Sequence, residues 1–178
     1  LMNESAIPSI PIFVDSPLAV NVTEVFRKHR ELYDAETQAF LDNGQDPFGF
    51  ARLRYIREVA ESKALNELRG SFVVISASGM CEAGRILHHL RNNISDPRNT
   101  VLITGFQAEN TLGRKIVEKE REVPIFGEPV RLRAEVVKIN ELSGHADQDE
   151  LLNWMAPAAP GLKKVFLVHG EPSQSGGL

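Results

Sequence analysis

Short apolar runs alternate with helical periodicity along most of this chain. The first run, residues 10–14, ends shortly before Pro17 and predicts a buried strand that enters a helix, because proline suits a first helical turn. Two further runs, 72–75 and 100–105, are each followed by a segment whose apolar residues recur at helical spacing. Strands that alternate with helices predict an α/β fold, with a mainly parallel sheet and helices on both of its faces.

The same patterns predict the remaining elements. Helices are expected over residues 18–32, 34–41, 58–68, 81–94 and 111–120, with a short strand inside 46–59. Alternating apolar and charged residues over 130–136 predict a half-exposed strand that forms one arm of a hairpin, after a turn at Gly127. Asp147 and Glu150 have capping-box spacing, which predicts a helix there, and a final strand is expected at 165–168.

The composition is that of an ordinary globular domain, since 42% of the 178 residues are hydrophobic and 13 are glycine. A net charge of −4 excludes a protein that coats nucleic acid through bulk positive charge, but a local basic groove stays compatible with it. Cys81 is the single cysteine, so any metal site must use His, Asp or Glu. Neither a membrane-length apolar run nor a secretory leader is visible, and we therefore expect a cytoplasmic protein without membrane association.

Two histidines that follow predicted strands are the first candidates for chemistry. His169 closes the apolar run 165–168, at the end of a strand where open α/β sheets place their sites, which favours a metal ligand. The alternative is a histidine that caps a core strand. His145 lies on a turn before the helix predicted at Asp147, where it is well placed for proton transfer. Its alternative is a surface residue that only contacts Asp147.

The other histidines are interpreted as structural. His88 and His89 are neighbours on an amphipathic helix and point about 100° apart, so they cannot share one metal ion. We expect one of them to be packed and the other exposed. His29 lies among charged residues and is expected to be solvated. The sequence shows no dense cluster of metal ligands, so a complete metal site cannot be assembled from this chain.

Two glycine-containing turns are candidates for binding phosphate, because each leads from a strand end to a helix N-terminus where backbone N–H groups and an arginine would face an anion. The residues concerned are Ser76, Ser78, Gly79, Met80 and Arg85 in the first turn, and Thr111 and Arg114 in the second. Arg85-Ile86 replaces the Lys-Ser/Thr pair of a Walker loop, which disfavours nucleotide triphosphate hydrolysis. A strand-to-helix turn without a ligand would look similar. We expect the two turns to converge on one rim that binds a polyanion.

Several ordered motifs closely resemble the β-CASP ribonucleases of the metallo-β-lactamase superfamily, over nearly the whole chain. They are Ile12-Phe-Val-Asp-Ser-Pro-Leu-Ala19, Ser76-Ala-Ser-Gly-Met80 with Gly84-Arg-Ile-Leu-His-His-Leu90, Gly105-Phe-Gln-Ala108 with Thr111-Leu-Gly-Arg114, Ser143-Gly-His-Ala-Asp147 and Leu167-Val-His-Gly-Glu171. The resemblance implies a Rossmann-like β-CASP domain that clamps RNA over a two-zinc centre. His169 matches the family's motif C zinc ligand, and His145 matches motif B, which is thought to steady or protonate the departing oxygen.

The family's dense histidine motif, its other zinc ligands and its acidic motif A precede the β-CASP insertion and are not visible here. The resemblance therefore implies a fragment: a β-CASP domain over residues 1–138, and a segment 139–178 that returns to the αββα metallo-β-lactamase domain. Our leading hypothesis is a zinc-dependent ribonuclease for single-stranded RNA, to which this chain supplies the RNA clamp and two histidines. With one zinc ligand, the chain alone should be inactive.

Two other hypotheses stay open at this point. One is a non-catalytic α/β module that binds a nucleotide or phosphorylated ligand at the two turns, and the other is a scaffold domain with a degenerate site. DNA-repair proteins share the architecture, but a histidine at motif C favours the RNA-processing branch. The sequence leaves open exonuclease or endonuclease action, and whether the protein is a homodimer.

Overall fold

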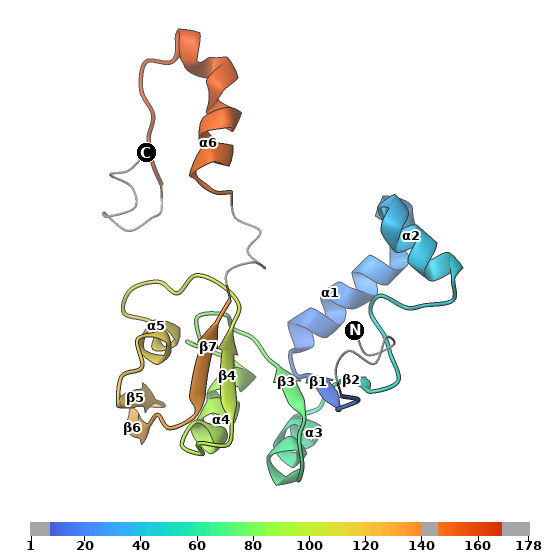
Figure 1. Ribbon diagram of the computed structural model, residues 1–178, viewed down its shortest axis with the longest axis vertical. Helices are drawn as coiled ribbons and strands as arrows, with labels where there is room; N and C mark the ends of the chain where they lie inside the picture. The colour runs from blue at the N-terminus through green and yellow to red at the C-terminus, as the bar shows by residue number, and fades with distance from the viewer. Residues whose placement is uncertain (1–7, 140–145, 169–178) are drawn as a thin grey trace.

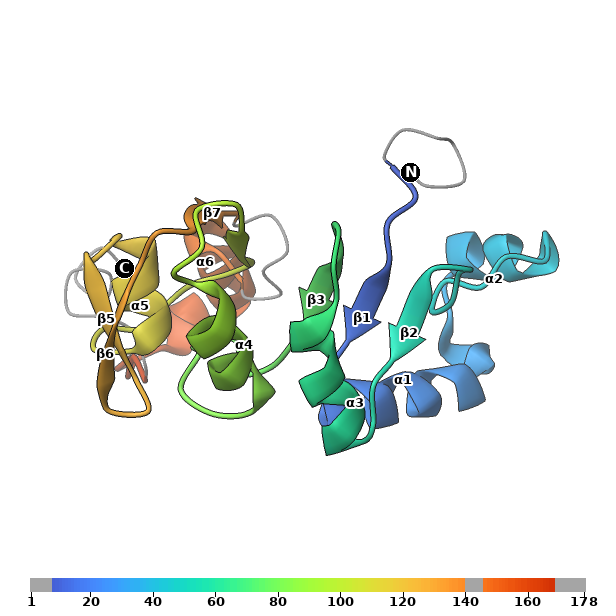
Figure 2. The ribbon, with the colours of Figure 1, turned by 90° about the horizontal axis from the view of Figure 1, so that it is seen from below.

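The computed structural model describes residues 8–139 and 146–168 and confirms an α/β fold. Its first sheet has the order β2-β1-β3 and is entirely parallel, with β1 (Ile12–Val14) between β2 (Leu53–Tyr55) and β3 (Val73–Ile75). Figure 2 shows the three strands side by side. The short strand expected inside 46–59 is therefore confirmed as β2, and the carboxyl ends of all three strands share one edge.

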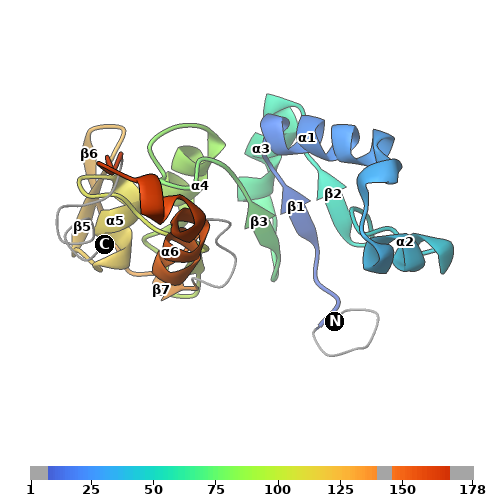
Figure 3. The same cartoon turned by 90° about the horizontal axis from the view of Figure 1, so that it is seen from above.

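Helices cover both faces of this sheet. The crossovers from β1 to β2 and from β2 to β3 run in opposite directions along the sheet, so right-handed connections place their helices on opposite faces. Figure 1 shows α1 (Pro17–Lys28) above the strands and α3 (Val59–Ala64) below them, with α3 extended by η2 (Leu65–Glu67). The second helix, α2 (Ala35–Asp42), lies beyond the end of α1, as Figure 3 also shows.

Local chemistry explains where α1 and α2 begin. Ser16 has extended backbone angles and its hydroxyl accepts a hydrogen bond from the Ala19 N–H, while Pro17 occupies the first turn, as the sequence predicts. Asp34 caps α2 in the same way through the Thr37 N–H.

One face of α1 differs from that of an ordinary core helix, because the apolar side chains of Leu18, Val22 and Val25 are 43 to 70% exposed.

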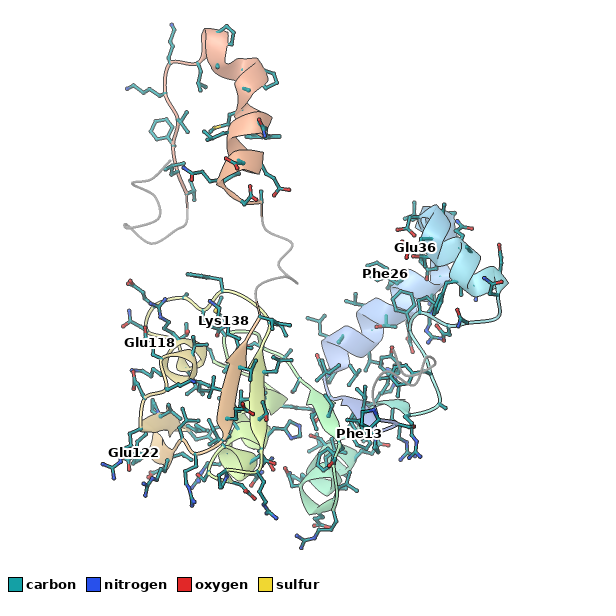
Figure 4. The ribbon with its side chains drawn as sticks, in the orientation of Figure 1. Phe13, Phe26, Glu36, Glu118, Glu122 and Lys138 are labelled. Atoms are coloured by element: carbon teal, nitrogen blue, oxygen red, sulfur yellow. The ribbon has the colours of Figure 1, made fainter. Side chains whose placement is uncertain are left out.

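The second half of the chain forms two small sheets. After α4 (Arg85–Asn93), β4 (Thr100–Ile103) pairs in parallel with β7 (Glu135–Lys138). Between them lie α5 (Leu112–Val117) and the antiparallel hairpin of β5 (Glu122–Ile125) and β6 (Glu128–Arg131). Figure 4 labels Glu118, Glu122 and Lys138 at the ends of α5, β5 and β7. The parallel pairing is as expected, but the parallel strands occupy two sheets rather than one.

The hairpin arm expected after Gly127 is confirmed as β6, but the single strand expected at 130–136 is wrong. Its first residues belong to β6 and its last to β7, and the chain changes partner in between. The Leu132 N–H donates to the Arg121 carbonyl, whereas the N–H groups of Arg133 and Ala134 both donate to the carbonyl of Ile94 at the end of α4. An alternating pattern records which side chains are buried, but it does not show that the backbone leaves one ladder for another.

Two separate cores stabilise the two halves. The smaller contains Phe13, Ile56 and Leu65, with Phe13 in edge-to-face contact with Phe72 at 5.9 Å between ring centroids. The larger joins α4, β4, α5 and the hairpin, and its fully buried side chains include Ile94, Ile116 and Ile125. The turns that lead into α4 and α5 are therefore anchored on the larger core.

The C-terminal part contains α6 (Gln148–Met155) and η3 (Ala156–Gly161), which lie apart from the sheets in Figure 1. The predicted capping box is confirmed, because Asp147 and Glu150 each accept a backbone hydrogen bond from the other. The strand expected at 165–168 is wrong: these residues adopt no strand and pair with none, and Phe166 is 81% exposed. Within the described residues, every helix is too short or too polar to cross a membrane.

Candidate functional site

The two glycine-containing turns meet, as the sequence predicts. The Gln107 side-chain amide donates to the Gly79 carbonyl at 3.0 Å, and the Gly113 N–H donates to the Met80 carbonyl at 3.0 Å. The Ala108 N–H also approaches the Met80 sulfur at 3.4 Å. Three contacts thus join the turn after β3 to the turn after β4. Turns that follow strands of two different sheets are therefore in direct contact.

The first turn is longer than the sequence indicates, because α4 begins at Arg85 and not at Cys81. Gly84 sets this boundary with φ of 87° and ψ of −168°, a conformation that other residues rarely adopt. A Cβ on Gly84 would lie 2.8 Å from the Ala77 carbonyl oxygen. The turn is closed by hydrogen bonds from the Ser78 N–H to the Ala83 carbonyl and from the Ile86 N–H to the Ala77 carbonyl.

The candidate phosphate-binding residues of the first turn have different environments. The Ser76 hydroxyl donates to the Asp15 backbone carbonyl at 3.0 Å. The Ser78 Oγ is sheltered from solvent and has no hydrogen-bond partner within the described part of the chain. Gly79 is exposed and Met80 is half-buried. The backbone around Gly79 is therefore the accessible part of this turn.

Arg85 is engaged inside the protein. Its guanidinium contacts the Asp15 carboxylate at 2.5 Å through Nη1, and Nη2 donates to the Arg57 carbonyl at 2.6 Å. A weaker hydrogen bond of 3.3 Å reaches the Ile56 carbonyl. The side chain is only 16% exposed. The structure thus places this arginine between α4 and the first sheet, where an anion bound at the turn would have to compete with a buried carboxylate.

Asp15 is the centre of a buried polar cluster that sequence reasoning missed. It has no exposed surface and accepts hydrogen bonds from Ser62 at 2.5 Å, Arg85 at 2.5 Å and His89 at 2.6 Å. Burial raises the pKa of the Asp15 carboxyl. The hydrogen bonds from Ser62, His89 and Arg85, together with the Arg85 charge, lower this pKa by more than burial raises it, so the net pKa lies below its ordinary value. The carboxylate is therefore ionised.

The sequence contained a signal for this cluster, because Asp15 directly follows an apolar strand at the edge where open α/β sheets carry polar residues. His89 is buried and His88 is exposed, which confirms that one of the pair is packed. His29 is also exposed, as expected, and contacts Glu31. Although Asp, His and Ser gather here, Ser62 donates to Asp15 and not to a histidine, so the cluster is not an activated nucleophile.

The second turn has its helix N-terminus already satisfied. Thr111 caps α5 by accepting from the Arg114 N–H at 3.2 Å, and the Leu112 N–H donates to the Glu82 carboxylate at 2.5 Å. Arg114 contacts Glu118 at 2.5 Å and donates to the Gln107 carbonyl at 3.4 Å. An internal carboxylate thus occupies the place where the sequence suggests an external anion, and the Arg114 guanidinium is paired with Glu118 of the same segment.

A cavity of about 360 Å³ opens beside the joined turns. Its walls come from α4 and α5, from the turns before these two helices and from the β5–β6 hairpin, and include Cys81, Asn110, Lys115 and Phe126. Burial, with a smaller effect from the Glu82 charge, raises the pKa of the Cys81 thiol to about 11. The thiol is therefore neutral at physiological pH and is not a nucleophile.

The two histidines with proposed chemical roles, His145 and His169, lie outside the described residues. Across 8–139 and 146–168, no three His, Cys, Asp or Glu side chains are grouped so as to hold a metal ion. The described residues therefore do not fit a zinc centre by themselves.

Sequence comparisons identify two families along the chain. Residues 1–116 match the Beta-Casp domain, and residues 129–178 match the Zn-dependent metallo-hydrolase RNA specificity domain. Ribonuclease TTHA0252 of Thermus thermophilus is 42% identical over 165 residues, which are 93% of this chain and 37% of the relative. An RNase J-like protein of Methanocaldococcus jannaschii is 32% identical over 166 residues, again 93% of this chain and 37% of the relative.

The transcription termination factor FttA of Pyrococcus abyssi is 36% identical over 124 residues, 65% of this chain and 19% of that protein. The chain thus spans between about a fifth and two fifths of the length of these curated relatives. Because the Beta-Casp match covers well over half of the chain and agrees with the parallel α/β sheet, the protein belongs to the Beta-Casp family.

Proposed function

We propose that this chain is part of a zinc-dependent ribonuclease that acts on single-stranded RNA in the cytoplasm, and that it supplies the surface that grips the RNA. The observation that carries this proposal is the junction of the two turns through Gln107 and Met80, which builds one surface at the carboxyl ends of β3 and β4. The family match and the names of two relatives, a ribonuclease and an RNase J-like protein, support RNA as the ligand.

Within this surface, we assign the phosphate contacts to the backbone of Gly79 and Met80 and to the Arg114 guanidinium, because the Ser78 N–H already donates to the Ala83 carbonyl. The Ser78 hydroxyl has no partner within the described residues, but it is sheltered from solvent and is therefore not assigned to an external phosphate. Ser76, Arg85 and Thr111 do not contact phosphate in this proposal. Each forms a hydrogen bond within the protein that stabilises the shape of its turn. Phosphate contacts of this kind fix the position of a strand without reading its sequence.

The two remaining candidate residues would serve the chemical step. We propose that His169 is a zinc ligand and that His145 holds or delivers a proton at the departing oxygen. Zinc, when bound, would activate water for attack on the phosphodiester. Because one histidine is too few to hold a catalytic zinc, the other ligands must come from polypeptide other than this chain.

We place the boundary between the two parts near residue 138. In support, β7 (Glu135–Lys138) pairs along its whole length with β4, so its backbone belongs with the sheet of the preceding domain. The segment 139–178 would then return to the metallo-β-lactamase domain. The match to the RNA specificity domain begins earlier, at residue 129, and includes β7.

The proposal is tested by binding of the chain to a labelled single-stranded oligoribonucleotide at several salt concentrations. Arg114→Gln should weaken binding several-fold and reduce the slope of log affinity against log salt by about one. Arg98→Gln is the control, since Arg98 likewise forms an ion pair with a nearby carboxylate, that of Asp96, but its side chain is far more exposed. Equal losses for both variants would show that binding depends on general charge and would refute the assigned surface.

The same preparation tests the division of labour. With zinc present, the chain alone should bind the oligoribonucleotide without cutting it, whereas robust cleavage that a chelator abolishes would contradict the need for further zinc ligands. Binding of a mononucleotide without any binding of RNA would instead support the small-ligand module, for which the cavity of about 360 Å³ beside the turns has a suitable size.

A further inference from the structure

The two ends of the first turn are both attached to one residue, Asp15. At the start of the turn, the Ser76 hydroxyl donates to the Asp15 backbone carbonyl. At its end, the Arg85 guanidinium contacts the Asp15 carboxylate. The chain between them carries the exposed Gly79. A single buried aspartate after β1 thus bonds to both ends of the turn. We call the bonds of Ser76 and Arg85 to Asp15 the clasp.

Two further side chains hold the Asp15 carboxylate of the clasp in place. Ser62 of α3 and His89 of α4 each donate to the same Asp15 carboxylate. A ring nitrogen 2.6 Å from a carboxylate oxygen carries the hydrogen, so His89 donates through Nε2. Because Asp15 has no exposed surface, loss of any donor leaves part of a buried charge without a partner. The geometry of α4 and of the turn is therefore tied to β1 by several hydrogen bonds at once.

We propose that Asp15 is a positioning residue for RNA binding: it never touches RNA, but it fixes the turn 76–85 in the conformation that presents the backbone around Gly79. This inference rests on the proposed function, because it takes RNA as the ligand of the turn. Arg85 accordingly contributes to binding through Asp15 and not as a direct phosphate ligand.

The experiment measures affinity for a labelled single-stranded oligoribonucleotide together with amide hydrogen exchange of the whole chain. Asp15→Asn keeps the shape of the side chain but removes its charge, and should weaken RNA binding about tenfold or more. Hydrogen exchange should become faster at amides 76–85 by a larger factor than at amides elsewhere in the chain. Asp96→Asn, which removes a surface carboxylate paired with Arg98, is the control and should stay within about twofold of the unaltered chain.

A second variant guards against a failure to fold. Ser62→Ala keeps both charges of the clasp and removes one hydrogen bond, so it should weaken RNA binding by about threefold, with the same local increase in exchange. A residue with only a general structural role would raise exchange throughout the small core around Phe13 and leave the affinity of the folded fraction unchanged.

Two results would overturn the inference alone. Unchanged affinity of folded Asp15→Asn and Ser62→Ala would show that the turn does not need the clasp. Tighter binding of Asp15→Asn with a salt slope steeper by about one would show that released Arg85 contacts phosphate directly. Failure of the unaltered chain to bind RNA would instead refute the proposed function, and this inference with it.

Discussion

Replacing Gly84 with alanine tests whether the first turn has the shape described above. Gly84 has φ of 87° and ψ of −168°, a region that is almost exclusive to glycine, and holding another residue there costs about 1–3 kcal/mol. The new Cβ would also lie 2.8 Å from the Ala77 carbonyl oxygen, a backbone atom that cannot rotate away. Relief of such overpacking costs about 1–3 kcal/mol more. We expect Gly84→Ala to lower the free energy of unfolding by about 2–6 kcal/mol.

The measurement is urea-induced unfolding followed by circular dichroism, with Gly44→Ala as the matched control. Gly44 also has a positive φ, 73°, but an added Cβ would have no neighbour within 4 Å. Its replacement should therefore cost only the backbone strain, about 1–2 kcal/mol. A loss for Gly84→Ala no larger than that for Gly44→Ala would refute the close approach to Ala77, and with it the compact form of the turn.

Three further predictions concern burial and charge. Because the pKa of Asp15 is depressed, its stabilising contribution is complete above the ordinary carboxyl value of about 3.9 and is lost as pH falls through the lower folded value. Asp15→Asn should therefore flatten the dependence of unfolding free energy on pH in that acid range, and an unchanged slope would contradict the buried hydrogen bonds. Cys81, with a pKa of about 11, should react with a thiol reagent at pH 8 only at rates that rise with denaturant, whereas rapid labelling of the native protein would count against its burial. Exposed apolar side chains along α1 should make this chain bind a hydrophobic dye, and Leu18→Lys with Val25→Lys should reduce that fluorescence while helix content is kept; equal fluorescence would place the dye elsewhere.

The sequence predicted the parts of the fold that depend on nearby residues. Strands β1, β3 and β4 lie within apolar runs, and the Asp147 cap needs only the residue three positions along the chain. The early start predicted for α4 has a local origin as well. Helical periodicity continues back to Cys81, but one glycine conformation at Gly84 overrides it, and a hydrophobic pattern contains no information on φ.

The position of Asp15 at a strand end was a signal in the sequence, but its partners in the polar cluster were beyond such reasoning because they are distant from it along the chain. Ser62, Arg85 and His89 lie 47, 70 and 74 residues from Asp15. Each has an ordinary local explanation, Asp15 as a strand end and His89 as one of two helical histidines. Only the pairing order β2-β1-β3 brings α3 and α4 to the end of β1. The assignment of Arg85 to phosphate followed from its place at a helix start, where the sequence could not show a buried carboxylate.

Gln107 shows why the contact between the two turns is a property of the fold and not of either motif. Its amide nitrogen donates to the Gly79 carbonyl, and its Oε1 lies 1.7 Å from the point where a Cβ on residue 113 would be. Gly113 is buried and has helical backbone angles, so glycine is not needed here for an unusual φ. It is needed because the absence of a side chain leaves space for the Gln107 amide. A side chain at 113 would displace Gln107 and break its bond to Gly79 without straining α5. The sequence of the second turn therefore helps to determine the position of the first, so the proposed RNA-binding surface depends on both motifs at once.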